Sequence, residues 1–184
     1  MSSWYNNRKI DRRKYLTTVQ VKMLTSVWNK KAFDDLEQGR INSLKTYMII
    51  QLGLQAGLRV AEIADLKISD CWITKGESTI FVRNGKGGKS DTIIIGNQLK
   101  TLISKFIDIK SQFNDPIDDE SYLLCNPSKE KYSRRSLQLR FKTAIKKAGL
   151  PDYLSIHSLR HTFCCELMNN PTASGGVSHV KTKV

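Results

Sequence analysis

The feature that most constrains the fold is a helix-length apolar stretch at residues 42–56, which ends directly at Gly57. Large apolar side chains recur along it, and beyond Asn42 and Ser43 its polar residues are few: Lys45, Thr46, Gln51 and Gln55. A helix that is apolar on most of its surface has to be enclosed by other elements, so we expect it at the centre of the core. Gly57 suits a helix C-cap, and residues 60–66 restart as a short helix. Arg59 therefore falls in the bend between two helices.

Helical and strand patterns surround this central stretch. A first helix begins at Thr17 or Thr18, because either hydroxyl is a suitable N-cap. Three β-branched or aromatic runs between glycine-containing turns predict a small antiparallel sheet at 70–73, 79–82 and 92–95. Further helices are expected at 98–112, at 135–148 and from 155 or 157 to 168. The predicted fold class is mainly α with a small three-stranded antiparallel β-sheet (α+β).

Composition divides the chain into three parts. Residues 1–16 are polar and basic and are expected to form an extended leader. Residues 17–170 carry the periodic patterns and are expected to form one globular unit. Residues 171–184 begin with the run PTASGG and have no periodicity, which is typical of a flexible tail.

Positive charge is clustered as well as abundant. The formal net charge is +13, and residues 129–147 hold eight cations against the single anion Glu130. Such clustering is the electrostatic pattern of a nucleic-acid-binding protein, although a solvated basic surface would look the same in sequence. We expect the DNA contacts of this basic helix to come from Arg134, Arg135, Arg140 and Lys142.

The cysteines and the apolar runs suggest a cellular compartment. Cys71, Cys125, Cys164 and Cys165 form no C-x-x-C pair, and the last two are adjacent, a poor geometry for bridging each other. We therefore expect reduced thiols, with Cys164 and Cys165 buried in a helix. No apolar run approaches membrane-spanning length and no signal peptide is visible. These patterns predict a cytoplasmic protein, nucleoid-associated if it acts on DNA, with no membrane partner.

Residues 157–161 read HSLRH and place a second arginine in apolar sequence. On a helix, His157 and Arg160 share one face, and His161 lies near it. Two arginines and a histidine brought together can hold one phosphate and move a proton at it, which indicates phosphoryl transfer on nucleic acid. A zinc site is disfavoured because the metalloprotease pattern needs glutamate where Ser158 stands. A structural histidine bonded to backbone remains open, more so for His161 than for His157.

Residues 84–90 read NGKGGKS and resemble a phosphate-binding P-loop. That motif requires glycine where Arg83 stands and a helix afterwards, whereas the strand-like residues 91–95 follow here. A β-hairpin turn is the better interpretation. It carries Lys86 and Lys89, either of which can bring an ammonium group to a DNA backbone.

Together, GLRVAEI at 57–63, the hairpin lysine and HSLRH at 157–161 resemble the tyrosine recombinases, the phage integrases and the Xer type. The resemblance covers roughly residues 15–168, beginning with YLT at 15–17. It implies the catalytic-domain fold of that family, which is mostly helical with one small antiparallel sheet. It also implies DNA integration or recombination by a mobile genetic element, with duplex DNA and other recombinase protomers in a tetrameric synapse as partners.

The resemblance further implies a mechanism. A tyrosine hydroxyl attacks a DNA phosphodiester, forms a 3′-phosphotyrosine and releases a 5′-hydroxyl, with no metal and no cofactor. Arg59 and Arg160 match the arginines that hold the non-bridging phosphate oxygens. Lys86 matches the lysine that protonates the leaving oxygen, with Lys89 as the alternative, and His157 matches the histidine that assists the attacking oxygen.

Two further residues match supporting positions in the family. Glu62 and His161 are expected to orient the arginines through hydrogen bonds. The nucleophile is the departure, because the family places it after the second arginine and the 24 residues after Arg160 contain no tyrosine. Tyr153, the last tyrosine, precedes the HSLRH motif, and His179 lacks the helical surroundings of the family's further histidine.

We therefore expect a recombinase catalytic domain without its last helices and without a nucleophile in this chain. The alternative hypothesis is a non-catalytic DNA-binding derivative that occupies or regulates recombination sites. A basic RNA-binding module is a third, weaker hypothesis.

Overall fold

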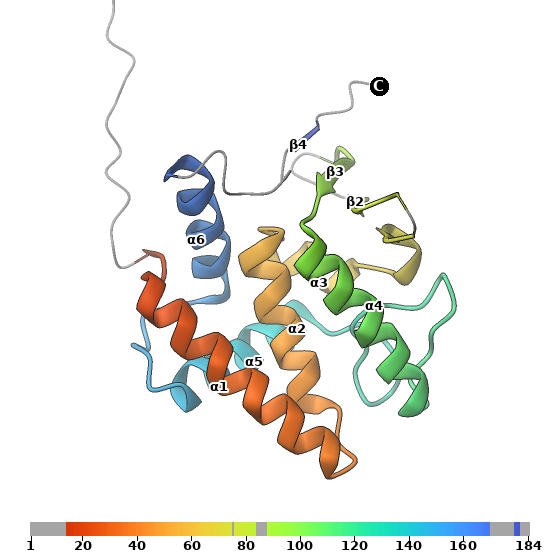
Figure 1. The fold of residues 1–184 in the computed structure, drawn as a ribbon, viewed down its shortest axis with the longest axis horizontal. Coiled ribbons are helices and arrows are strands. Elements are labelled where there is room, and N and C mark those ends of the chain that lie inside the picture. The colour runs from red at the N-terminus through yellow and green to blue at the C-terminus, as the bar shows by residue number, and fades with distance from the viewer. Residues whose placement is uncertain (1–13, 75, 84–87, 170–178, 181–184) are drawn as a thin grey trace, which may run out of the picture.

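The computed structural model describes residues 14–74, 76–83, 88–169 and 179–180. Helices dominate it, and a small sheet lies at one end beside the C-terminal end of the second helix (Figure 1). The elements in chain order are α1 (Thr18–Glu37), α2 (Asn42–Gln55), α3 (Val60–Asp65), the 3₁₀ helix η2 (Ile68–Asp70), β1 (Cys71–Trp72), β2 (Thr79–Val82), β3 (Asp91–Ile94), α4 (Asn97–Gln112), α5 (Arg134–Lys147), α6 (Ile156–Asn169) and β4 (His179–Val180). The predicted class, mainly α with a small antiparallel sheet, is confirmed.

Helix α2 is the centre of the core, as its sequence predicts. It packs against α1, α4, α5 and α6. Met48 and Ile50 are fully buried, and even Lys45 and Gln51 are almost inaccessible to solvent. An apolar helix enclosed on all sides fixes the position of whatever follows it, and here that is the bend with Arg59.

Helix α1 and the residue before its cap are hydrogen-bonded to α5 and α6. Its N-cap is Thr17, whose hydroxyl accepts the Gln20 N–H while the Gln20 side chain accepts the Thr17 N–H. The Trp28 indole N–H donates to the Ala144 carbonyl at 3.1 Å. Leu16, the last residue of the predicted leader, is buried and its N–H donates to Thr162 Oγ1 at 2.9 Å. The packed domain thus already includes Leu16, while residues 1–13 lie outside the described residues.

The sheet is antiparallel, with β2 in the middle of the three predicted strands. Cys71 pairs with Ile80, and Val82 pairs with Asp91 at the hairpin end. The tail prediction does not hold for residues 179–180, because they form β4 beside β3. The physical reason is that the outer edge of β3 offers unpaired backbone groups to any short extended segment.

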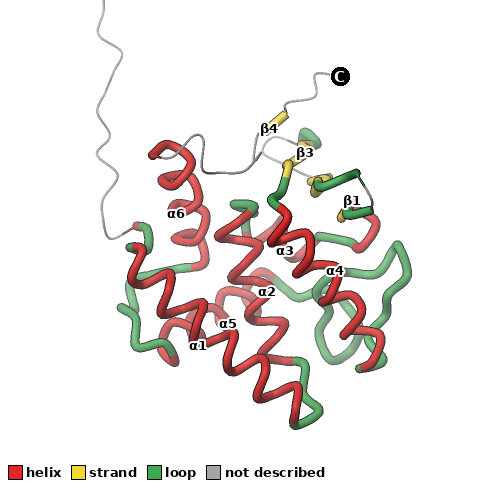
Figure 2. The backbone as a smooth tube through the Cα atoms, in the orientation of Figure 1, coloured by secondary structure: helices red, strands yellow, loops and turns green. Residues whose placement is uncertain are grey.

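A long loop (residues 113–133), drawn in green in Figure 2, joins α4 to α5. Buried charges hold it to α2. Lys45 on α2 lies 2.6 Å from the Asp115 carboxylate, and Lys129 lies 3.0 Å from it. Burial alone would raise the pKa of Asp115, but hydrogen bonds from these two lysines lower it. A buried carboxylate with two cationic partners ties the loop to the core and sets where α5 begins.

The cysteines are all free, as predicted, but the buried ones are Cys71 and Cys125. Burial raises the pKa of the Cys71 thiol to about 12, so this thiol stays protonated. Cys164 and Cys165 are only partly buried, which corrects the expectation of a buried pair. Along α6 the core positions are taken by Leu159 and Phe163 instead. Across the described residues, no helix combines the length and apolarity needed to cross a membrane.

Candidate active site

The site lies where α6 crosses the C-terminal end of α2, with side chains of α6 packed directly against the α2 backbone. A Cβ added at Gly53 would lie 2.7 Å from the Leu159 side chain, and one at Gly57 would lie 2.3 Å from the Phe163 ring. Gly57 also has φ +61°, a left-handed conformation that favours glycine. Two glycines on α2 and its cap therefore let α6 approach more closely than any other residue type would allow.

This close approach brings Arg160 on α6 to the bend that carries Arg59. The Arg160 guanidinium donates from Nη1 to the Gly57 carbonyl, 103 positions away in the sequence and two residues before Arg59. Arg59 itself is the extended N-cap residue of α3. Arg160 on α6 is thus bonded to the bend that carries Arg59.

Glu62, predicted to support the arginines, is bonded to Arg59 at two points. One carboxylate oxygen accepts the Arg59 backbone N–H at 2.7 Å, and the other accepts the Arg59 Nη1 at 2.5 Å. The Glu62 side chain is 5% exposed and that of Arg59 is 39% exposed. A buried carboxylate held by two donors on one residue leaves the guanidinium a fixed direction and an open outer edge.

The histidines lie on the solvent side of α6. His157 is exposed in its first turn, on the face that it shares with Arg160. His161 is exposed one turn later. Within the described part of the chain neither imidazole has a hydrogen-bond or ion-pair partner, so the structural interpretation of His161 gains no support. No group of three metal-ligating side chains exists among the described residues either.

The hairpin interpretation is confirmed and the P-loop is excluded, because β3 rather than a helix follows the glycines. Lys89 is exposed, next to Gly88 with φ +75°. Lys86 lies outside the described residues. The structure therefore describes the two strands that carry this hairpin and one of its two candidate lysines.

The four basic residues predicted to bind DNA do not form one group. Arg134 and Arg135 are exposed in the first turn of α5. Arg140 instead donates to the Asn42 carbonyl and to Thr46 Oγ1, and its guanidinium lies over the Tyr132 ring. A fourth residue, Lys142, donates to the carbonyls of Asp152 and Leu154. The structure uses Arg140 and Lys142 for packing and leaves Arg134 and Arg135 open to solvent.

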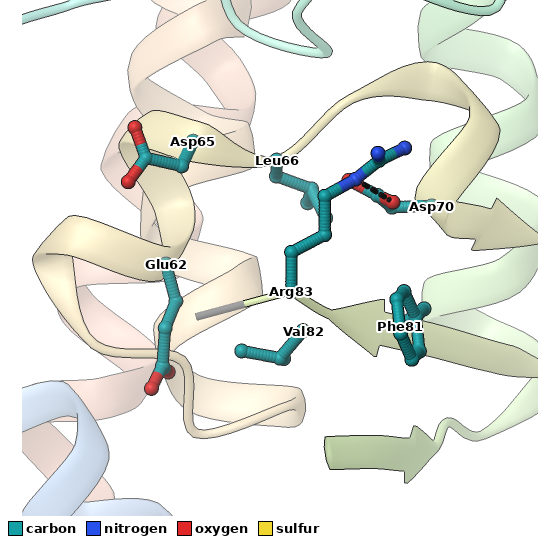
Figure 3. A pocket seen from close by; sticks show the side chains of 7 residues that line it. All are labelled: Glu62, Asp65, Leu66, Asp70, Phe81, Val82 and Arg83. Carbon is teal, nitrogen blue, oxygen red and sulfur yellow. Dashed lines mark hydrogen bonds and ion pairs between the residues drawn. The ribbon is translucent and has the colours of Figure 1, made fainter. Parts of the chain in front are cut away.

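Sequence reasoning missed an ion pair beside the site. A small pocket lies between α3 and β2, and Figure 3 shows the Arg83 side chain directed across it to Asp70. The distance from Arg83 Nε to Asp70 Oδ1 is 2.7 Å. The one available signal was Arg83 itself, a cation directly after an alternating strand, but nothing in the sequence indicates its partner.

The assembled groups suit a phosphodiester. Arg59 lies in the bend beside the buried Glu62 carboxylate, Arg160 is bonded to the same bend from α6, and His157 shares a face of α6 with Arg160. The local charge of Arg59, Glu62 and Arg160 is positive by one, which complements the single negative charge of a DNA phosphate. Planar guanidinium groups can each bind two phosphate oxygens, and they stabilise the extra charge of a five-coordinate phosphorus.

Comparison with known proteins identifies the family of the chain. Residues 14–177 match the phage integrase family. The chain belongs to the phage integrase family of tyrosine recombinases. It is 32% identical over 162 residues to tyrosine recombinase XerD of Rickettsia conorii, an alignment that covers 83% of this chain and 50% of the relative. The chain thus spans about half the length of the curated relatives it matches.

Solved recombinase structures have the same fold as this integrase-family chain. The crystal structure of XerA recombinase superposes with a TM-score of 0.67 at 25% identity, covering 85% of this chain and 51% of XerA. Lambda integrase residues 75–356 bound to DNA give a TM-score of 0.62 at 17% identity, covering 96% of this chain and 59% of that one. The predicted catalytic-domain fold is therefore confirmed.

Proposed function

We propose that this integrase-family chain binds duplex DNA and holds the scissile phosphate between Arg59 and Arg160 during site-specific strand cleavage and rejoining. The observation that carries the proposal is the bond from Arg160 to the Gly57 carbonyl, beside the Arg59–Glu62 pair. That bond joins the two sequence motifs at the bend that carries Arg59. The DNA-bound state of lambda integrase, which shares the fold, supports DNA as the partner.

The proposed reaction is a transfer between oxygens at one phosphorus. A tyrosine oxygen attacks the phosphorus, the bond to the 5′-oxygen breaks, and a 3′-phosphotyrosine forms. Arg59 and Arg160 stabilise the negative charge on the non-bridging oxygens. His157 assists proton transfer at the attacking oxygen, and Lys86 or Lys89 gives a proton to the leaving 5′-oxygen. One phosphoester bond forms for each one that breaks. The released 5′-hydroxyl can therefore attack the phosphotyrosine and rejoin the strand without a nucleotide cofactor.

The tyrosine itself is the open part of this proposal. The last tyrosine of the printed sequence, Tyr153, lies before α6 and not after it. We therefore expect this chain alone to bind DNA without forming a covalent adduct. In the assembled reaction, copies of the protomer on DNA would form the tetrameric synapse. A non-catalytic derivative that occupies recombination sites is the second candidate, because the bonded Arg160 and the exposed cations of α5 would serve DNA binding without cleavage as well.

A small external nucleophile separates these two candidates. Duplexes selected from a random pool by binding serve as substrate, and hydroxylamine or hydrogen peroxide replaces the tyrosine oxygen. A phosphate-activating site should then nick the duplex at a defined phosphate and leave a 5′-hydroxyl end, and Arg160→Ala should abolish the nick. Binding without a nick would favour the non-catalytic derivative. Tighter binding to RNA than to duplex DNA would overturn both.

Salt dependence tests the DNA surface. If several phosphates are contacted, affinity should fall about a hundredfold or more between low and moderate salt. Arg134→Ala should reduce the slope of log affinity against log salt by about 1, because an exposed cation releases one counterion. Lys142→Ala is the matched control and should leave the slope unchanged, since its ammonium is bonded to carbonyls. An affinity independent of salt would contradict DNA binding.

A further inference from the structure

The end of β2 is fastened to η2 by one buried carboxylate. Arg83 directly follows β2, and its Nε donates to Asp70 Oδ1 at 2.7 Å. Its Nη2 donates to Ser69 Oγ at 3.1 Å. The Asp70 side chain is 3% exposed, so Arg83 is the cationic partner that makes its burial tolerable.

The same carboxylate also holds the start of η2. Asp70 Oδ2 accepts the Lys67 backbone N–H at 3.0 Å. Each Asp70 oxygen therefore has a donor, one from the segment after α3 and one from the strand. Because two nitrogens of the planar guanidinium bond to Asp70 and Ser69, the interaction fixes the position of Arg83 relative to η2 in addition to neutralising the carboxylate.

The Asp70–Arg83 ion pair lies next to the Arg59–Glu62 pair. Glu62 and Arg83 line the same pocket between α3 and β2, and in Figure 3 the Glu62 carboxylate points away from Arg83. Glu62 is bonded to Arg59. From Arg59 through the six residues of α3 to Asp70 and Arg83, the phosphate-holding bend and the base of the hairpin are thus one connected unit.

The hairpin needs such a base. Its last ladder pair is Val82 with Asp91, and the residues between them include three glycines and both candidate lysines. The ends of β2 and β3 at Val82 and Asp91 therefore set where this segment leaves the sheet. We propose that Asp70 and Arg83 are positioning residues that fix the end of β2 and hence the direction from which Lys89, on the returning side of the hairpin, approaches the phosphate. This inference rests on the proposed function.

The first test measures position and needs no activity. Spin labels are placed at Lys89→Cys on the hairpin and Lys105→Cys on α4, in a chain with Cys164→Ser and Cys165→Ser. Arg83→Met should broaden the distribution of distances between the labels. Arg83→Lys, which keeps a cation beside Asp70, should restore much of the narrow distribution. Lys131→Met removes a different ion pair to α3 and is the matched control. An unchanged distribution in Arg83→Met, with the fold retained in thermal melting, overturns the inference.

The second test measures the chemical consequence with the nicking assay and the selected duplex. Arg83→Met should lower the nicking rate about tenfold or more while DNA affinity stays constant. Replacing the leaving 5′-oxygen by sulfur should restore the rate, because a thiolate leaves without a proton. Arg160→Ala should not be restored by sulfur. If Arg83→Met were equally slow on both substrates, the inference would fail. Absence of nicking by the unmodified chain would count against the proposed function, and the spin-label test would still decide the positioning role.

Discussion

The two ends of α2 place arginine in opposite conditions. At the N-terminal end, Arg140 donates to the Asn42 carbonyl, the Asn42 side chain and Thr46, and covers the Tyr132 ring. At the C-terminal end, Arg59 and Arg160 each make one side-chain hydrogen bond within the described residues. A guanidinium has five N–H donors, so the first arginine is largely consumed by the fold and the other two are still able to bind a ligand. For the proposed DNA contacts, donors left available on a fixed guanidinium are therefore a better criterion than charge alone.

The glycines at the two ends differ in the same way. Gly39 and Gly57 both have positive φ, at +69° and +61°. Around a Cβ added at Gly39 there is nothing within 4 Å, whereas one at Gly57 would collide with Phe163. The N-terminal end needs only a turn, and the C-terminal end needs a turn and close contact with another helix.

The largest expected effect is that of Gly57→Ala. Left-handed strain together with the collision against Phe163 should destabilise the fold by about 3 kcal/mol or more. Gly39→Ala is the matched control and should cost about 1 kcal/mol, from strain alone. Urea denaturation of both variants measures the difference. Equal losses would mean that α6 can move away from α2 without penalty.

The next effect separates binding from stability. Arg160→Ala should weaken DNA binding about 10- to 100-fold, the value of a charge-assisted hydrogen bond, with little change in melting temperature. Arg59→Ala should behave alike. Arg140→Ala should do the reverse, lowering stability by about 1–3 kcal/mol while DNA affinity is kept. Fluorescence anisotropy and thermal melting on the same samples check both. Collapse of Arg160→Ala on heating would assign it a structural role.

The smallest effect is seen only in acid, at the N-terminal end of α2. Hydrogen bonds from Ser43 and Arg40 lower the pKa of Asp35 from 3.8 to about 2. A depressed pKa stabilises the fold above pH 4, and this contribution of about 2 kcal/mol is lost as the pH falls from about 4 to 2. Asp35→Asn should flatten the stability profile in that window. Because Asp115 also titrates low, the difference between the two urea profiles is the quantity to measure.

Patterns local in sequence were enough to predict most of the fold. The apolar run of α2, the cap at Thr17 and the left-handed Gly57 each depend on neighbouring residues, and each is confirmed. The arginine pair was predictable from its two motifs. Its geometry was not, because the bond from Arg160 to the Gly57 carbonyl joins segments 103 residues apart.

What sequence reasoning missed depends on partners that only the fold brings together. The cations of α5 look alike in sequence. In the fold, however, the Arg140 guanidinium donates to Asn42 and Thr46, whereas the Arg134 side chain is exposed to solvent. The pair between Asp70 and Arg83 crosses from η2 to β2 and has no periodic signature. The adjacent cysteines were expected inside because their helix is apolar, but its core positions belong to other residues.

The bond between Leu16 and Thr162 has a mechanical consequence. Thr162 Oγ1 accepts the Leu16 N–H at 2.9 Å and donates to the Ser158 carbonyl at 2.8 Å, in the turn that lies between His157 and Arg160. The segment at Leu16 is therefore hydrogen-bonded to α6, the helix that carries Arg160 of the proposed phosphate site. A pull applied ahead of Leu16 would act on α1 through the chain and on α6 through this bond, so tension at the entrance is transmitted to the helix that carries Arg160.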